Sequence, residues 1–138
     1  MAKPVTYLNP PNSTPPAGMY SHVARMAAGE LAFIAGQVAV DRSGASVGAG
    51  DVAAQVNQVF QNLGDLLADL GADFEHVVQL TTYLTSADSL PAFMSARAAL
   101  FPKLFPGGSY PPNTLLIIDR LVKPEFLIEV EAIARLPG

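Results

Sequence analysis

The hydrophobic positions between residues 52 and 70 recur at steps of three and four, the spacing of one face of an α-helix. Asp51 stands where an N-cap is needed, and Gly71 stands where the helix must stop. The pattern therefore predicts a long helix with one apolar stripe that packs on another element. The stripe consists of Val52, Val56, Val59, Phe60, Leu63, Leu66, Leu67 and Leu70.

A second helix is predicted from about residue 90 to Phe101. Asp88 or Ser89 can cap this helix, and Pro91 suits its first turn. The run FPGGSYPP then forces the chain out of the helix. The side chains expected to face inward are Leu90, Phe93, Met94, Ala98 and Phe101.

Five segments have the composition or the alternating pattern of β-strands. The clearest is 76–85, which is rich in β-branched residues. The runs 19–26 and 31–38 are separated by the turn-like AAGE, so we expect them to pair as a hairpin. Residues 113–119 and 127–135 complete the set. Two helices among five strands predict an α+β fold with both helices on one face of a mixed sheet.

The last predicted strand distinguishes the two faces of this sheet. One side is apolar and suited to lie under the helices, namely Ile128, Val130, Ala132 and Ala134. The other side carries Glu129, Glu131 and Ile133. The segment TLLIID is apolar on both sides, which is unusual for a wetted face. A partner subunit that covers the second face would account for both patterns.

The N-terminal segment differs in composition from the rest of the chain. Residues 1–18 are rich in proline, which favours an extended arm, and 19–138 have the size of a single domain. The segment lacks the apolar core of a signal peptide, and no run of residues is long and apolar enough for a membrane span. We therefore expect a cytoplasmic protein without a membrane partner.

Composition and charge exclude several classes of function. The chain is 50% hydrophobic and only 14% charged, so part of its surface is expected to be buried in an oligomer. The net charge is −4 and the basic residues are scattered, which disfavours nucleic-acid binding. Cysteine is absent, and His22 and His76 lie far apart in sequence, so no metal site is expected. A GxSxG elbow and a phosphate-binding loop are also missing.

Three side chains are candidates for chemistry on pattern alone. The hydroxyl of Tyr20 could bond a ligand, although an aromatic residue in a strand is usually there for packing. Glu129 and Glu131 point the same way on the face thought to be covered. Partial burial there would raise a carboxyl pKa towards values useful for proton transfer. The alternative roles of this pair are a solvated rim or an ion pair between subunits.

Four motifs occur in a fixed order: PPAGMYSH, FIAGQV, DVAAQVNQVFQNL and IEVEAIA. With them the chain resembles the RidA/YjgF family from about Pro10 to Arg135. The resemblance implies a chorismate-mutase-like α+β fold, with two helices on one face of a five- to six-stranded mixed sheet. It also implies a homotrimer with an inner β-barrel and three ligand clefts between subunits. The activity implied is hydrolysis, without cofactor, of reactive enamines and imines such as 2-aminoacrylate to a keto acid and ammonia.

The resemblance also implies roles for individual residues. Tyr20 matches the cleft tyrosine, Gly36 matches a glycine whose backbone lines the pocket, and Glu129 matches the glutamate that positions or activates water. Asn113 and Thr114 stand where deaminating members read P-A-R-S, in which the arginine clamps the substrate carboxylate. An amide carries no charge and has a shorter reach than a guanidinium. The chain is therefore expected to be an arginine-lacking member.

The presence of Asn113 in place of the arginine determines which substrates we expect. We expect hydrolysis of an imine, an enamine or a related small metabolite other than 2-aminoacrylate, with Asn113 reading a neutral polar group. Alternatively, Asn113 caps the strand end, or Arg25 or Arg120 supplies the missing charge. A second class of function is a trimer that binds or senses a small metabolite without catalysis. The ribonuclease label attached to some relatives fits poorly with the acidic net charge.

Overall fold

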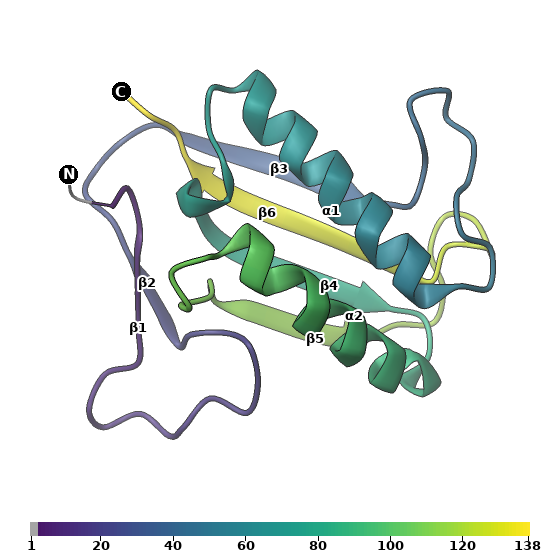
Figure 1. The fold of residues 1–138 in the computed structure, drawn as a ribbon, viewed down its shortest axis with the longest axis horizontal. Helices are drawn as coiled ribbons and strands as arrows, with labels where there is room; N and C mark the ends of the chain where they lie inside the picture. The colour runs from purple at the N-terminus through teal and green to yellow at the C-terminus, as the bar shows by residue number, and fades with distance from the viewer. Residues whose placement is uncertain (1–2) are drawn as a thin grey trace.

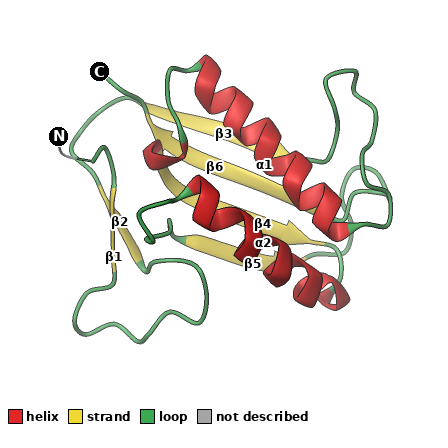
Figure 2. Cartoon of the chain, in the orientation of Figure 1, coloured by secondary structure: helices red, strands yellow, loops and turns green. Residues whose placement is uncertain are grey.

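A computed structural model of the chain describes residues 3–138. Two helices, α1 (Val52–Asp69) and α2 (Leu90–Leu104), lie side by side on one face of a four-stranded sheet (Figure 1 and Figure 2). The strand order in this sheet is β3-β6-β4-β5. The α+β architecture with both helices on one face therefore agrees with the prediction, and none of the helices found in residues 3–138 covers the opposite face of the sheet. We call that opposite side the open face.

Helix α1 begins and ends close to where the sequence predicts, although Leu66 and Leu70 of the predicted apolar stripe are exposed. The backbone N–H of Ala54 donates to Oδ1 of Asp51 at 3.0 Å, which satisfies one free donor of the first turn. Gly71 has a φ of +72°, a conformation that ends the helix and that favours glycine. The side chains of Val56, Phe60 and Leu63 are fully or almost fully buried against the sheet.

Helix α2 packs on the sheet through Phe93 and Phe101, as the sequence predicts, and also buries Arg97. Its buried positions are Phe93, Arg97 and Phe101, spaced four residues apart. Met94 is 42% exposed and Ala98 is exposed, so their expected inward orientation is wrong. The charged residue buried between the two phenylalanines, Arg97, was not among the residues predicted to face inward. The helix also continues to Leu104, past the expected end at Phe101.

The sheet is built around its two longest strands, β4 (Val77–Leu84) and β6 (Ile128–Arg135), which pair antiparallel. Strand β5 (Asn113–Ile117) runs parallel to β4, and Asn113 is opposite Leu80 in the register. The alternation predicted for β6 is confirmed, because all four positions that were predicted to lie under the helices are buried. Glu129 and Glu131 therefore lie on the open face.

The predicted hairpin of 19–26 with 31–38 does not form. Strand β2 (Val23–Arg25) pairs with β1 (Thr6–Leu8) in a separate two-stranded sheet, and β3 (Leu31–Gln37) pairs with β6. The six strands of the described residues are thus divided between a two-stranded and a four-stranded sheet, so the prediction of a single sheet of five to six strands is wrong. Arg135 donates to the carbonyls of Ala27 and Ala28 at 3.0 Å, and this holds the connection between β2 and β3 away from a tight turn.

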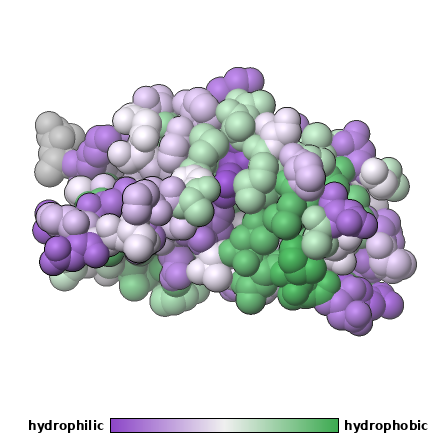
Figure 3. Space-filling view, turned by 90° about the horizontal axis from the view of Figure 1, so that it is seen from below, coloured by the Kyte–Doolittle hydropathy of each residue, from purple (hydrophilic) through white to green (hydrophobic). Residues whose placement is uncertain are grey.

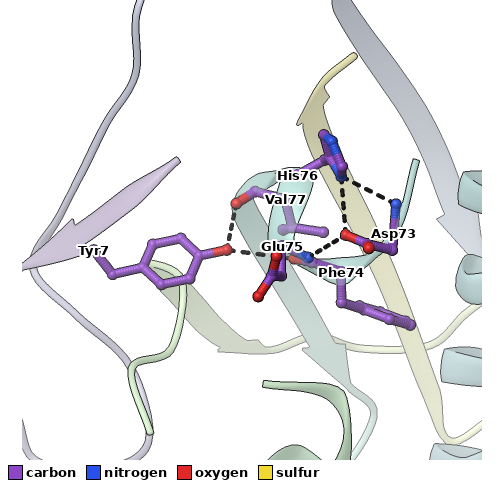
Figure 4. A network of polar contacts seen from close by, with 6 residues as sticks. All are labelled: Tyr7, Asp73, Phe74, Glu75, His76 and Val77. Carbon is purple, nitrogen blue, oxygen red and sulfur yellow. Dashed lines mark hydrogen bonds and ion pairs between the residues drawn. The ribbon is translucent and has the colours of Figure 1, made fainter. Parts of the chain in front are cut away.

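The proline-rich arm 1–18 contains β1, although regular strand was not expected there, and its first two residues lie outside the described part. The hydroxyl of Tyr7 on β1 donates to the carbonyl of Val77 at 2.6 Å, at the start of β4 (Figure 4). Beside it, the backbone N–H of Glu75 donates to Asp73 Oδ1, and the His76 ring contacts the same carboxylate. The arm is therefore fastened to the domain.

Candidate functional site

A depression of about 440 Å³ lies between the β1–β2 loop, helix α2 and the start of β5. It brings together three of the residues singled out in the sequence, Tyr20, Asn113 and Thr114. Gly18, Met94 and Arg97 also line it. The three elements come from separate parts of the chain, so the depression exists only once the β1–β2 loop has folded onto the domain.

Asn113 enters this depression with a free donor. Its Oδ1 accepts a hydrogen bond from the hydroxyl of Thr82 at 3.0 Å, and Thr82 is fully buried on β4. Its Nδ2 is buried and has no hydrogen-bond partner among residues 3–138. The side chain therefore does not cap the end of the strand by bonding to local backbone. A buried donor of this kind is costly unless a ligand or water meets it.

Arg97 is a candidate binding residue that the sequence analysis did not identify. Its side chain on α2 is only 5% exposed, and its guanidinium lies over the rings of Phe93 and Phe101, 5.3 and 5.9 Å from their centroids. Nη2 donates to the sulfur of Met94 at 3.0 Å, whereas Nε is buried without a partner within the described residues. The signal in the sequence is the spacing of Phe93, Arg97 and Phe101, which places the arginine on the inward face.

The electrostatics of Arg97 follow from its burial. Removal from water lowers the pKa of the guanidinium, and the nearby Tyr20 opposes this shift. The ion pairs found among residues 3–138 are Arg42 with Asp65 and His76 with Asp73, so no carboxylate of the described chain neutralises Arg97. The depression is therefore lined by a positive charge that lacks a counterion.

Arg25 and Arg120, the two arginines considered earlier, do not line this depression. Arg120 donates to the carbonyls of Leu121 and Val122, which belong to its own loop. Arg25 lines a different depression beside Arg135. Arg97 on α2 lines the depression together with Asn113.

Glu129 and Gly36 form a second group on the open face. A Cβ built on Gly36 would lie 2.6 Å from Cδ of Glu129, which is closer than real contacts allow. Gly36 thus makes room for the glutamate rather than simply lining a pocket. Burial raises the pKa of the Glu129 carboxyl, and the neighbouring Glu131 adds to the rise. No side chain or backbone donor of residues 3–138 hydrogen-bonds this carboxylate.

The two carboxylates of β6 differ in their surroundings. The hydroxyl of Tyr83 on the adjacent β4 donates to Oε1 of Glu131. This bond is the largest cause of the raised pKa of the Tyr83 hydroxyl. Glu131 is therefore engaged by a neighbouring strand, whereas Glu129 keeps its oxygens free. Of the two, Glu129 is the better candidate for holding a water molecule.

Within one chain the two groups lie on opposite faces of the sheet. Asn113 bonds to Thr82, which is buried on the helix side, and Glu129 lies between two residues buried on that same side. Gly36 and Glu129 are absent from the lining of the depression that holds Tyr20, Asn113 and Thr114. Residues 3–138 contain no cluster of three or more side chains suited to hold a metal ion. They also contain no helix long and apolar enough to cross a membrane.

Comparison with known proteins identifies relatives over almost the whole chain. A family model described as endoribonuclease L-PSP matches residues 11–136. The protein DfrA of Myxococcus xanthus is 41% identical over 117 residues, which cover 85% of each chain. The 2-iminobutanoate/2-iminopropanoate deaminase of Rattus norvegicus is 27% identical over 122 residues, covering 88% of this chain and 85% of the deaminase.

A solved structure also matches almost the whole chain. The crystal structure of YyfB from Yersinia pestis, described as a protein of unknown function of the conserved Rid family, matches with a TM-score of 0.85. The two are 34% identical, and the match covers 96% of this chain and 99% of YyfB. The family model and this structure agree over the segments that carry both groups of candidate residues. The chain belongs to the endoribonuclease L-PSP family, which is the RidA/YjgF family of Rid proteins.

Proposed function

We propose that this protein hydrolyses an imine or an enamine to the corresponding carbonyl compound and ammonia, without a cofactor. The observation that carries the proposal is the state of Glu129, a half-buried carboxylate with a raised pKa and no donor among the described residues. Such a group is suited to accept a proton from water. The name of the rat relative, an imine deaminase, supports the same class of reaction.

The reaction requires only water as a second reactant. An enamine first becomes an imine by gaining a proton on carbon and losing one from nitrogen to solvent. A water molecule positioned by Glu129 then adds to the imine carbon, with one of its protons passing to the carboxylate while the imine nitrogen takes a proton from solvent, which gives a carbinolamine. The protonated carboxyl group donates its proton to the carbinolamine nitrogen, and the C–N bond breaks as the hydroxyl proton returns to solvent, which leaves a carbonyl compound and ammonia. Glu129 ends in its initial state, so the cycle is balanced.

The proposal includes a homotrimer with three clefts between subunits. Tyr20, Asn113 and Thr114 lie on one side of the sheet and Glu129 on the other, so one chain cannot close a site around both groups. A second copy that packs on the open face would bring its Tyr20, Asn113 and Thr114 close to Glu129 of the first copy. We place this trimer and its small-molecule ligand in the cytoplasm. Burial of Glu129 by the partner would raise its pKa further.

The test is release of ammonia from an imine generated in the assay, such as 2-iminobutanoate or 2-aminoacrylate, measured above spontaneous hydrolysis. We expect Glu129→Gln to lower turnover by about 10²–10⁴-fold, the usual contribution of a general base, while ligand affinity stays close to that of the wild type. Glu131→Gln is the matched control and should keep turnover, because its side chain can still accept from Tyr83.

The alternative function is binding or sensing of a small metabolite without catalysis. Wild-type protein that accelerates none of these imines, but binds a keto acid, would favour this alternative. Equal loss of turnover and affinity in Glu129→Gln, or loss of neither, would also contradict the catalytic role. The expectation against 2-aminoacrylate, which follows from Asn113 standing in place of the carboxylate-binding arginine, stays a prediction, and including this substrate in the assay tests it.

A further inference from the structure

A second depression, of about 390 Å³, lies between the N-terminal arm, β2 and the end of β6. Three basic side chains line it, namely Lys3, Arg25 and Arg135, and no aspartate or glutamate of the described residues does so. They are far apart in sequence, and the fold brings them to one place. Three of the eight lysine and arginine residues of an acidic chain therefore surround one depression.

These three cations have no counterion in the described part of the chain. The ion pairs found among residues 3–138 involve none of them. Arg25 is also not among the arginines whose side chains hydrogen-bond within these residues, so its N–H groups are available to a ligand. Like charges placed around one space repel each other, and an anion between them turns this repulsion into attraction.

The guanidinium of Arg135 is held in one orientation before any ligand arrives. Its Nε and Nη2 donate to the carbonyls of Ala27 and Ala28, both at 3.0 Å. A Cβ at Gly29 would lie 2.8 Å from Nε, so the glycine lets the guanidinium lie against the connection between β2 and β3 (Figure 1). The Nη1 group stays free to bind an acceptor, and a side chain that is already fixed loses little entropy on binding.

The other donors are placed by the β1–β2 pairing and by the arm. Thr6 on β1 lies opposite Arg25 on β2, and its hydroxyl adds a neutral donor to the lining. Lys3 precedes β1, and a Cβ at Gly107 would lie 2.9 Å from its Nζ. A glycine thus makes room for the Lys3 ammonium, as another does for the Arg135 guanidinium.

We propose that Lys3, Arg25 and Arg135, together with Thr6, bind the phosphoryl group of a small phosphorylated metabolite. One planar carboxylate is satisfied by a single guanidinium, whereas a phosphate monoester is nearly a dianion with three strong acceptor oxygens, which matches three cations. None of the residues with a role in the proposed reaction lines this depression. The site therefore goes beyond that reaction, and a bound ligand would tie the arm to β2 and to the end of β6.

The experiment is a calorimetric titration of the full chain at pH 8 and low salt with glycerol 3-phosphate, inorganic phosphate and acetate. We expect glycerol 3-phosphate to bind at least about tenfold more tightly than acetate. Arg25→Met should weaken glycerol 3-phosphate about tenfold or more, because a charge-assisted hydrogen bond is lost. Arg42→Met is the matched control, since it removes the same charge from an exposed arginine outside the depression, and it should bind normally.

A second readout uses the melting temperature. Glycerol 3-phosphate should raise the melting temperature of the wild type and of Arg42→Met, because it binds the folded chain only. Arg25→Met should melt like the wild type without ligand, since this side chain makes no ion pair with residues 3–138, and it should lose the rise. Lys3→Met tests the same point from the arm and should behave in the same way.

Several results would overturn the site. They are normal binding of glycerol 3-phosphate by both Arg25→Met and Lys3→Met, an equal loss in Arg42→Met, or acetate binding as tight as that of glycerol 3-phosphate. Binding to phosphatidylcholine vesicles that contain phosphatidic acid, without binding of glycerol 3-phosphate, would assign the phosphoryl group to a lipid and reject the metabolite. Phosphate binding that depends on Arg25 supports the site whether or not an imine is hydrolysed, so the two proposals fail separately.

Discussion

The surroundings of Glu129 affect both the reactivity of its carboxyl group and the stability of the folded protein. Its carboxyl is held near Glu131 in a half-buried place, and Gly36 leaves the room it occupies. These surroundings disfavour the charged form, which is the form that a general base needs. The protein therefore keeps a carboxylate where folding alone would favour a neutral side chain, as is common at functional sites.

Because the folded protein disfavours the charged form of Glu129, we predict that Glu129→Gln is more stable than the wild type at a pH where this carboxyl group is ionised. The carboxyl pKa is 4.5 in the unfolded chain and higher in the folded one, so the wild type loses stability as pH rises from about 4.5 through the folded value. The variant should be the more stable protein at pH 7 and equal to the wild type below about pH 4. Urea unfolding at both pH values measures this. A variant that is less stable at pH 7 would contradict it.

Elements with strong periodicity could be predicted from the sequence, and the unusual contacts could not. Helix α1, strand β4 and the two faces of β6 follow from hydrophobic spacing and from caps such as Asp51. The burial of Arg97 on α2 was not predicted, because charged side chains usually lie at the surface. Pairing partners of β2 and β3 depend on long-range contacts that spacing does not encode.

At the level of elements, Tyr7 fastens the β1–β2 sheet to the start of β4 through its hydroxyl. Tyr7→Phe should lower the free energy of unfolding by about 0.5–1.5 kcal/mol, because the buried Val77 carbonyl loses a partner while ring packing is kept. Urea unfolding measures the change. Tyr110→Phe is the control and should be nearly neutral, since its hydroxyl makes no hydrogen bond with residues 3–138 while its ring packs on Phe101. Equal effects of the two variants would contradict this assignment.

The molecule as a whole exposes more apolar surface than is expected of a protein that stays monomeric. Phe33 on the open face is 73% exposed, and Leu116 and Ile117 on the edge strand β5 are also exposed. Figure 3 shows a continuous hydrophobic area on the side where β5 is the outermost strand. Patches of this kind usually mark an interface. They support the proposed assembly of identical chains through the open face and its edge.

Sedimentation should therefore give a mass of about 43.5 kDa for three chains of 14.5 kDa. Phe33→Lys should shift the protein towards monomer, because a charge buried between subunits lacks a partner. Leu66→Lys on the outer side of α1 is the control and should leave the mass unchanged. If the wild type sediments as a monomer, or if Phe33→Lys keeps the mass of the wild type, the intersubunit site is wrong.

The β1–β2 pairing closes residues 9–22 into a loop whose ends are tied together, and this loop supplies Gly18 and Tyr20 to the depression. The main core under α1 and α2 is formed largely by other segments. Substitutions in this loop can thus change which ligands fit the depression. The main core and Glu129, on the other face of the sheet, would stay unchanged. Evolution of new ligand preferences among relatives is expected to concentrate in this stretch of chain.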